Sequence, residues 1–386
     1  MNKSSGYKSA LNVMDGIDQP GQINKEMAGK LKVRKSGSQE VSYYVSGILD
    51  GNRTILSQAI TLIESSLPRH QEKAQEIIDM CLKSRQSAVG SQQSAVSSQH
   101  PPSIIHHPSS SIRIGITGVP GVGKSTFIEA LGKQLTSQGH KLAVLAIDPS
   151  SSRSKGSILG DKTRMEELAV DPNAFIRPSP AAGSLGGVAR KTRETIILCE
   201  AAGFDVIFVE TVGVGQSETV VHSMVDFFLL LMLAGAGDEL QGIKRGIIEM
   251  ADTIIINKAD GDNIKKAQLA RMEYSNALHL FPPSESGWTP VVDVCSSKTK
   301  EGISNIWNII TDYQSFTKQN GFFEKRRMEQ NRQNLYETIE AALKSHFFSR
   351  KDISHSLAKL EKEILEGKAN PYISAKLLLK EYFSKG

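Results

Sequence analysis

The stretch Ile112–Leu135, IRIGITGVPGVGKSTFIEALGKQL, decides how the central part of this chain folds. It begins with a short apolar run, Ile112–Ile116, which is typical of a buried strand. The residues Gly118–Ser125 then fit the phosphate-loop pattern GxxxxGK[ST] without a gap, and apolar residues at helical spacing follow them. A strand, a glycine-rich loop and a helix in this order predict a domain that holds a nucleotide by its phosphates.

Each part of this loop has a chemical task. Gly118, Gly121 and Gly123 let backbone N–H groups turn inward around a phosphate, and the N-terminus of the following helix adds a partial positive charge. Lys124 supplies a mobile cation to the β- and γ-phosphate oxygens, and the Ser125 hydroxyl can ligate Mg²⁺. The residues that we expect to bind the phosphates are Gly118, Val119, Pro120, Gly121, Val122, Gly123, Lys124, Ser125 and Thr126.

A second motif indicates which base is bound. The segment IIINKAD places Asn257, Lys258 and Asp260 at the end of an apolar run, in the NKxD arrangement of GTPases. The Asp260 carboxylate can accept from the N1–H and the exocyclic amine of guanine, whereas adenine would leave it buried and unpaired, at a cost of about 1.5–3 kcal/mol. Lys258 would lie along the ring. The next strand ends in Ser296, Ser297 and Lys298, which can offer backbone N–H groups to guanine O6, so we expect GTP rather than ATP.

Carboxylates stand at other predicted strand ends. Asp148 follows one strand, Asp161 lies in the next loop, and Glu210 ends another strand shortly before Gly213. The carboxyl ends of parallel strands converge on the phosphates, so these acids are placed to hold Mg²⁺ directly or through water, together with Ser125. Gly213 can donate its N–H to the γ-phosphate. For Asp148 a cap on the following turn is the alternative.

Hydrolysis depends on further residues. Val214 stands where Ras-like GTPases carry the Gln that orients the attacking water, and Gln216 lies two residues further on. We therefore predict slow intrinsic hydrolysis that a partner accelerates. The glycine-rich segment Ala234–Asp252 is either an ordinary solvated loop or a mobile switch from which Lys244 or Arg245 swings toward the phosphates. The expected catalytic residues are Lys124, Asp148, Asp161, Glu210 and Lys244.

The chain divides into five regions by composition. We expect a disordered leader over 1–40, a helical region over 41–85, a Ser/Gln/Pro-rich flexible insert over 86–111, the nucleotide-binding domain over 112–320 and a helical region over 321–386 that packs on its own domain or pairs with a second copy. Near-continuous apolar runs alternate with helices in the central region, which predicts a doubly wound α/β fold with a mostly parallel sheet and helical extensions at both ends. The predicted strands are Ile112–Thr117, Leu142–Ile147, Val206–Glu210, Phe227–Leu233, Thr253–Asn257 and Pro290–Cys295.

Bulk composition excludes several classes of function. The net charge is +5, but Lys and Arg are spread among Asp and Glu, which indicates a solvated surface rather than a nucleic-acid-binding face. No apolar run approaches the roughly 20 residues of a membrane span, so we expect no membrane partner. The three cysteines lie far apart and suggest a reducing compartment without disulfides. His100, His106 and His107 form a weak candidate metal tract, for which a solvated loop is the alternative.

Taken in order, the motifs GVPGVGKSTFIE, AIDPSS, GSILGDKTRM, VETVGVGQSE, AGAGDELQGIK and NKAD resemble the methylmalonyl-CoA mutase-associated GTPases, the MeaB/ArgK group that includes the methylmalonic aciduria type A protein. The resemblance covers about residues 41–348. It implies a homodimeric, Mg²⁺-dependent GTPase that acts as a chaperone, gating adenosylcobalamin delivery to a mutase and protecting that enzyme. It also implies that residues 238–244 form a switch that responds to the mutase.

Some features depart from this resemblance or leave alternatives open. Ala234 stands where the family pattern has Pro, and Ser297 replaces a common Ala. A GTPase metallochaperone and a phosphotransferase remain alternative functions, although we identify neither a dense metal motif nor a substrate base. The low-complexity insert favours a eukaryotic source and hence the mitochondrial matrix, with the cytoplasm expected for a bacterial source. The acidic residues of the leader count against a presequence.

Overall fold

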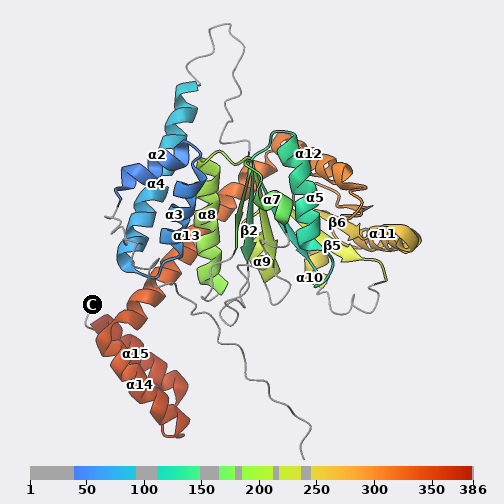
Figure 1. Ribbon diagram of the computed structural model, residues 1–386. Helices are drawn as coiled ribbons and strands as arrows, with labels where there is room; N and C mark the ends of the chain where they lie inside the picture. The colour runs from blue at the N-terminus through green and yellow to red at the C-terminus, as the bar shows by residue number, and fades with distance from the viewer. Residues whose placement is uncertain are drawn as a thin grey trace, which may run out of the picture. The chain divides into compact units, whose positions relative to one another are not determined.

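The computed structural model describes residues 39–92, 111–147, 165–178, 185–211, 217–235 and 245–384, and residues 41–386 form one compact unit. Its centre is a sheet of seven parallel strands in the order β3-β2-β4-β1-β5-β6-β7 (Figure 1). The strands are β1 (Ile112–Gly118), β2 (Leu142–Ile147), β3 (Ala174–Arg177), β4 (Val206–Thr211), β5 (Phe227–Leu233), β6 (Thr253–Asn257) and β7 (Val291–Val294). The predicted doubly wound α/β fold is confirmed.

Helices cover both faces of the sheet. One face packs against α5 (Lys124–Ser137) and α12 (Ile303–Gln319), and the other packs against helices that include α8 (Leu185–Ala201) and α11 (Ile264–Leu278). Strand β5 shows why its sequence is apolar throughout: Phe227 and Leu229 face the α5 side, whereas Phe228 and Leu230 face the other side. The period of two along a strand therefore buries this run from Phe227 to Met232 and leaves Leu233 half-buried. Short helices α7 (Glu166–Ala169), α9 (Ser217–His222), α10 (Arg245–Met250) and the 3-10 helix Gly261–Asn263 complete the domain.

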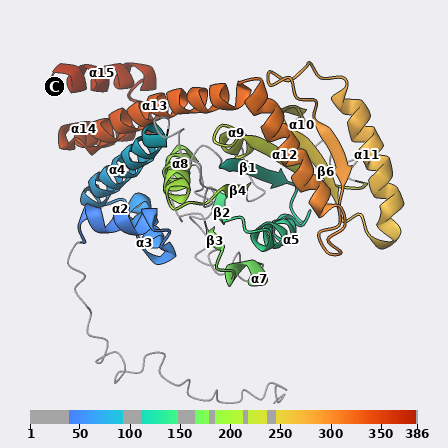
Figure 2. The same ribbon diagram turned by 90° about the horizontal axis from the view of Figure 1, so that it is seen from above.

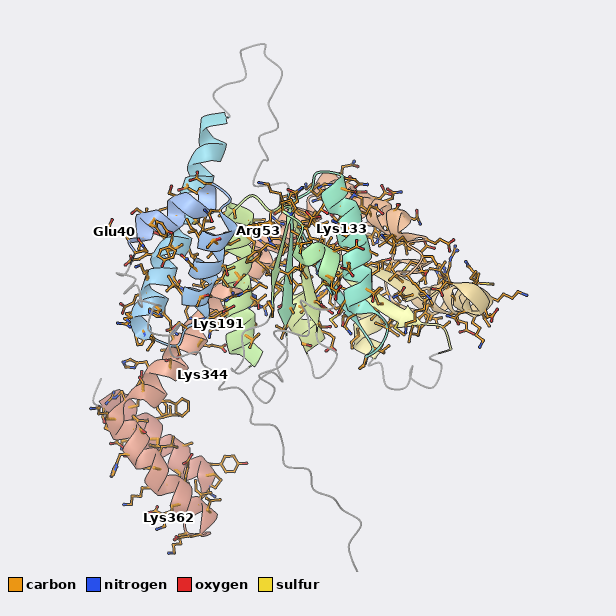
Figure 3. The ribbon with its side chains drawn as sticks, in the orientation of Figure 1. Glu40, Arg53, Lys133, Lys191, Lys344 and Lys362 are labelled. Atoms are coloured by element: carbon orange, nitrogen blue, oxygen red, sulfur yellow. The ribbon has the colours of Figure 1, made fainter. Side chains whose placement is uncertain are left out.

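The edge strand β3 was not predicted from the sequence. Only four residues long, it has two fully buried side chains, and its local pattern is too short to distinguish it from a loop. Contacts from distant parts of the chain hold the turn before it: Lys133 Nζ lies 2.6 Å from an Asp171 carboxylate oxygen, and Arg53 donates to the Asp171 carbonyl oxygen at 2.9 Å. Figure 3 labels Arg53 and Lys133, which come from helices on opposite faces.

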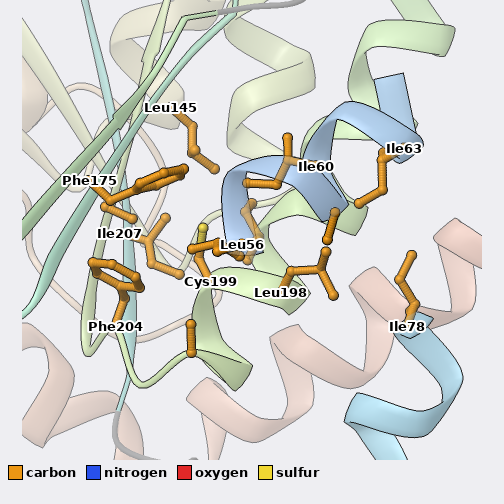
Figure 4. Packing of buried hydrophobic residues seen from close by; sticks show 14 of the residues in the cluster. Leu56, Ile60, Ile63, Ile78, Leu145, Phe175, Leu198, Cys199, Phe204 and Ile207 are labelled. Atoms are coloured by element: carbon orange, nitrogen blue, oxygen red, sulfur yellow. The ribbon is translucent and has the colours of Figure 1, made fainter. Parts of the chain in front are cut away.

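Three N-terminal helices form an additional layer on α8. They are α2 (Val41–Leu49), α3 (Arg53–Glu64) and α4 (Pro68–Gln92), and all three contact α8. Figure 4 shows Leu56 and Ile60 of α3 packed toward Leu198 and Cys199 of α8. Helix α4 continues to Gln92, so it extends into the segment expected to begin a flexible insert at residue 86. Residues 93–110, with the candidate histidines, lie outside the described residues.

The C-terminal helices are α13 (Phe322–Ser349), α14 (Lys351–Leu365) and α15 (Pro371–Ser384) (Figure 2). Helix α13 contacts α8 and α12, and Arg327 of α13 donates two hydrogen bonds to Asp226, which directly precedes β5. Helices α14 and α15 pack on each other and bury few side chains. Among the helices of the described ranges, none is both long and apolar enough to cross a membrane.

Candidate functional site

The candidate site lies where the central strands end. Glu210 of β4 is paired with Ile116 of β1 on one side and with Ala146 of β2 on the other, so three strand ends meet at this point. The Thr211 hydroxyl donates to the Thr117 hydroxyl at 2.8 Å, which joins β4 to the beginning of the phosphate loop. The sheet order thus brings Glu210, which is only 6% exposed, beside the loop that follows β1.

The phosphate loop has the backbone shape that its glycines predict. Gly118 has a φ of +154°, and a Cβ there would lie 2.4 Å from the Leu231 carbonyl oxygen. Gly123, with a φ of +96°, caps the first turn of α5, and a Cβ there would lie 3.0 Å from Asn257 Nδ2. Side chains at these positions would disturb the loop or its neighbours. The loop therefore fits a phosphate group held by backbone N–H groups at a helix N-terminus.

The Lys124 ammonium group lies inside the curve of this loop. Its Nζ donates to the Gly118 carbonyl oxygen at 2.8 Å and to the Val119 carbonyl oxygen at 3.4 Å. Burial lowers the pKa of Lys124, while the carboxylates of Glu210 and Glu218 act in the opposite direction. The arrangement holds a cation where phosphate oxygens would bind. Glu218, at the start of α9, was not singled out from the sequence, because nothing in the local pattern places it near Lys124.

The expected base-reading segment is attached directly to the phosphate loop. Asn257 Nδ2 donates to the Val122 carbonyl oxygen at 2.9 Å, and Lys258 Nζ donates to the Gly121 carbonyl oxygen at 2.8 Å. Lys258 has a φ of +60°, a left-handed conformation that is uncommon for a side chain larger than glycine, and Asn263 Nδ2 donates to its carbonyl oxygen at 2.7 Å. The chain turns sharply here and directs both side chains toward the loop.

The segment after β7 closes the same site. The Ser296 hydroxyl donates to Asp260 Oδ2 at 2.6 Å, and the Ser297 N–H and hydroxyl both donate to Asn257 Oδ1. We expected backbone N–H groups of this segment to meet guanine O6. The Ser297 N–H donates to Asn257 Oδ1, and the Ser296 N–H donates to the Glu301 carbonyl oxygen at 3.0 Å. The contact of this segment with guanine O6 stays a prediction. Serine at 297 thus adds a hydroxyl bond to Asn257 that an alanine would lack.

Two of the residues predicted to hold Mg²⁺ lie in the described part of the site. Ser125, in the first turn of α5, and Glu210 carry side-chain oxygen atoms, the type of ligand that Mg²⁺ prefers. The other expected ligands and switch residues, Asp148, Asp161, Gly213 and Lys244, lie outside the described residues, as do Val214 and Gln216. In the described ranges there is no cluster of three or more His, Cys, Asp or Glu side chains that could hold a metal ion.

Comparisons with known proteins agree with this geometry. The family model for the methylmalonyl Co-A mutase-associated GTPase MeaB matches residues 84–352. A mouse protein named methylmalonic aciduria type A homolog, mitochondrial, is 44% identical over 340 residues, which are 88% of this chain and 79% of the mouse protein. GTPase ArgK of Escherichia coli is 45% identical over 302 residues, which are 78% of this chain and 84% of that protein. The crystal structure of a LAO/AO transport system kinase is similar with a TM-score of 0.63 and 34% identity, covering 89% of this chain and 97% of that one.

Proposed function

Since this chain belongs to the family of methylmalonyl Co-A mutase-associated GTPases and is itself a GTPase, we propose that it acts as a GTP-driven chaperone of an adenosylcobalamin-dependent mutase. In this role it gates delivery of the cofactor to the mutase and protects that enzyme. The observation that carries the proposal is the match of the family model over residues 84–352. The attachment of Asn257 and Lys258 to the phosphate loop supports a guanine nucleotide as its substrate.

Within the site we assign each residue a chemical role. Lys124 and the loop N–H groups bind the β- and γ-phosphates and stabilise the charge that develops as the terminal phosphoryl group leaves. Asp260 accepts from guanine, while Asn257 holds the base-reading segment against the loop. Ser125, Asp148, Asp161 and Glu210 hold Mg²⁺, which when bound neutralises phosphate charge. Gly213 senses the γ-phosphate, and Lys244 belongs to the segment that responds to the mutase.

Gating of cofactor delivery requires two states of the protein, the GTP-bound form and the GDP-bound form. A GTPase without a glutamine after its switch glycine orients the attacking water poorly, so hydrolysis by the isolated protein is slow. Binding of the mutase orders the site so that the attacking water is correctly oriented, and hydrolysis therefore accelerates. A ligand changes such an equilibrium only when it binds the two states with different affinity, so the mutase must prefer the GTP-bound or the GDP-bound form.

We also propose that two copies of the chain form a homodimer through α13. Leu335, Ile339 and Leu343 of α13 recur every four residues and so lie on one side of the helix, with 58%, 47% and 58% of each residue exposed. Exposed apolar side chains gathered on one face are typical of an interface with another protein. We assign this face to a homodimer.

We place the protein in the mitochondrial matrix if its source is eukaryotic, as the mouse relative's name supports, and in the cytoplasm if it is bacterial.

The decisive experiment measures GTP hydrolysis by the full chain alone, with the apo-mutase, and with the mutase and adenosylcobalamin. We expect slow hydrolysis alone, acceleration of at least tenfold by the mutase, and co-elution of the two proteins. The Lys124→Ala variant should lose hydrolysis in every mixture. The absence of both a complex and any acceleration would overturn the chaperone function. Transfer of labelled γ-phosphate to a protein, rather than to water, would favour the phosphotransferase alternative.

A further inference from the structure

Two buried threonine hydroxyls join the strand that leads into the phosphate loop to the strand that carries Glu210. Thr117 directly precedes Gly118 of the loop, and Thr211 directly follows Glu210. The Thr211 hydroxyl donates to the Thr117 hydroxyl at 2.8 Å, with Thr211 0% exposed and Thr117 2% exposed. The register pairs Ile116 with Glu210, so the next step along β1 and β4 places the two threonines opposite each other. Their bond therefore fixes one strand end relative to the other.

The threonine pair lies on the face of the sheet that is opposite to the Glu210 side chain. Along β4, Phe208 packs on the α5 side of the sheet and Val209 packs on the α8 side. Because side chains alternate along a strand, Glu210 faces the α5 side, where the phosphate loop leads into its helix, and Thr211 faces the α8 side. The hydroxyl pair can therefore act on a bound nucleotide only through Glu210 and the phosphate loop.

The sheet is closely packed on the face that carries the threonines. Gly115 of β1 lies on this face, two positions before Thr117, and a Cβ there would be 2.9 Å from Val221 Cγ1 of α9 and 2.8 Å from Phe228 Cδ2 of β5. Helix α9 contacts both β1 and β4, and Figure 2 shows it beside β1. Since both hydroxyls are buried in this packing, removal of one hydroxyl leaves the other without this bond.

Each threonine is adjacent to a group of the candidate site. The carbonyl oxygen of Gly118, which follows Thr117, accepts from Lys124 Nζ at 2.8 Å. The carboxylate of Glu210, which precedes Thr211, acts on the same ammonium group and opposes the lowering of its pKa by burial. The hydroxyl bond thus determines how the carboxylate is placed relative to the loop that holds Lys124.

We propose that Thr117 and Thr211 are positioning residues for GTP hydrolysis, because their hydrogen bond holds Glu210 at a fixed place beside the phosphate loop. The inference rests on the roles proposed above for Lys124 and Glu210, but it does not depend on the mutase. A displaced Glu210 leaves the loop able to bind phosphates and slows the chemical step, because catalysis requires closer alignment than binding does. The pair therefore contributes more to kcat than to the affinity for GTP.

The test uses variants of the full chain that keep the shape of the side chain. Thr117→Val and Thr211→Val each remove the bond, and each should lower kcat for GTP hydrolysis about tenfold while KM and the affinity for GDP change less than about threefold. Thr211→Ser keeps the hydroxyl and should retain most of the rate. The double valine variant should lose no more than one single variant does, because both changes remove the same bond.

Thr253→Val is the matched control. Thr253 is 0% exposed, and its hydroxyl donates to the Val291 carbonyl oxygen at 2.8 Å, between the beginnings of β6 and β7 at the opposite end of the strands. This variant should lower the unfolding temperature about as much as the other two valine variants do, but it should leave kcat unchanged. Thermal unfolding checks each variant, and if one valine variant of the pair does not fold, the other carries the test.

Three results would overturn the proposal. They are an unchanged kcat in a folded valine variant of the pair, a loss of GTP affinity as large as the loss of kcat, and equal slowing by Thr253→Val. Lys124→Ala separates failure of this inference from failure of the site assignment. If Lys124→Ala loses hydrolysis and the valine variants do not, only the positioning role is wrong, whereas hydrolysis that survives Lys124→Ala would contradict the site itself.

Discussion

Asn257 joins two functions of the candidate site, because its Nδ2 donates to the Val122 carbonyl oxygen of the phosphate loop at 2.9 Å while its Oδ1 accepts from Ser297. The side chain is 1% exposed, so these bonds form out of contact with water. The phosphate loop and the segment expected to read guanine therefore hold each other in position. A change at Asn257 should affect the whole nucleotide rather than the base alone.

The first prediction concerns this link. Asn257→Ala removes the bond to Val122 and the bonds from Ser297, and it leaves buried groups unpaired, at about 1–3 kcal/mol. We expect GTP and GDP affinities to fall together by about tenfold or more, as measured by titration of a fluorescent guanine nucleotide. Asn308→Ala, at an exposed position of α12, should change neither affinity. A loss restricted to GTP would contradict the structural role of Asn257.

The second prediction concerns the base. The Ser296 hydroxyl donates to Asp260 Oδ2 at 2.6 Å and fixes the carboxylate that we expect to accept from guanine. Asp260→Asn replaces an acceptor by a donor, which no longer matches the guanine amine but does match the second carbonyl of xanthine. Competition binding should show lower affinity for GTP and higher affinity for xanthosine triphosphate. If the variant kept the GTP preference of the unaltered chain, Asp260 would not read the base.

The sequence predicts the parts of this site that depend on short-range pattern. Strands β1, β2, β4, β5, β6 and β7 are largely apolar runs, and the phosphate loop carries its glycines at fixed positions. Strand β3 escapes prediction because its position depends on Lys133 and Arg53, which reach Asp171 from distant helices. The same holds for Glu218, whose effect on Lys124 arises only when β4 lies beside β1. The local sequence pattern does not indicate which residues that are distant in the sequence will meet in the fold.

The third prediction concerns the attachment of α13. Arg327 donates from Nη2 to Asp226 Oδ2 at 2.6 Å and from Nε to Asp226 Oδ1 at 2.8 Å, across 101 positions of the sequence. The Asp226 side chain is 1% exposed, so removal of Arg327 leaves a buried charge that keeps the hydrogen bond from the Arg113 backbone N–H but loses its charged partner. Arg327→Met should lower the free energy of unfolding by about 3–5 kcal/mol.

Denaturant unfolding followed by circular dichroism measures this change. The control Arg332→Met alters an exposed arginine of the same helix and should stay within about 0.5 kcal/mol of the unaltered chain. A loss of less than 1 kcal/mol for Arg327→Met would show that Asp226 finds another partner.

The fourth prediction concerns pH. His140 Nδ1 lies 2.6 Å from Asp205 Oδ2, and this hydrogen bond raises the pKa of His140 above its ordinary value of 6.5. For Asp205 burial acts to raise the pKa, but the bonds from His140 and the Lys141 N–H outweigh it and lower the value below 3.8. Because the folded-state pKa of His140 is raised, its contribution to stability is complete below pH 6.5 and is lost as the pH rises through that folded-state pKa. Because the folded-state pKa of Asp205 is lowered, its contribution to stability is complete above pH 3.8 and is lost as the pH falls through that folded-state pKa.

The pair should therefore stabilise the protein most between about pH 4 and 6.5. His140→Gln should lower the free energy of unfolding at pH 6 more than at pH 9, in a series of urea titrations. His279→Gln, at an exposed histidine after α11, should show no such difference. Equal destabilisation by His140→Gln at both pH values would mean that the charged pair does not form.

The last prediction concerns the second copy. The proposed interface is the exposed face of Leu335, Ile339 and Leu343 on α13, a helix whose first half is fixed to the core by Arg327. Leu335→Asp/Leu343→Asp places two charges on this face, and burial of unpaired carboxylates between copies is strongly unfavourable. We expect light scattering to show a dimer for the unaltered chain and a monomer for this variant. The side chains are exposed within one copy, so the fold itself should lose little stability.

The control Lys359→Asp places a charge at an exposed position of α14 outside this face and should remain dimeric. A double leucine variant that stays dimeric would assign the interface to another surface. A monomeric variant also separates the two proposed roles of the C-terminal helices, because its GTP hydrolysis can be measured with and without the mutase. If the monomer responds to the mutase as the dimer does, then dimerisation is not part of the gate.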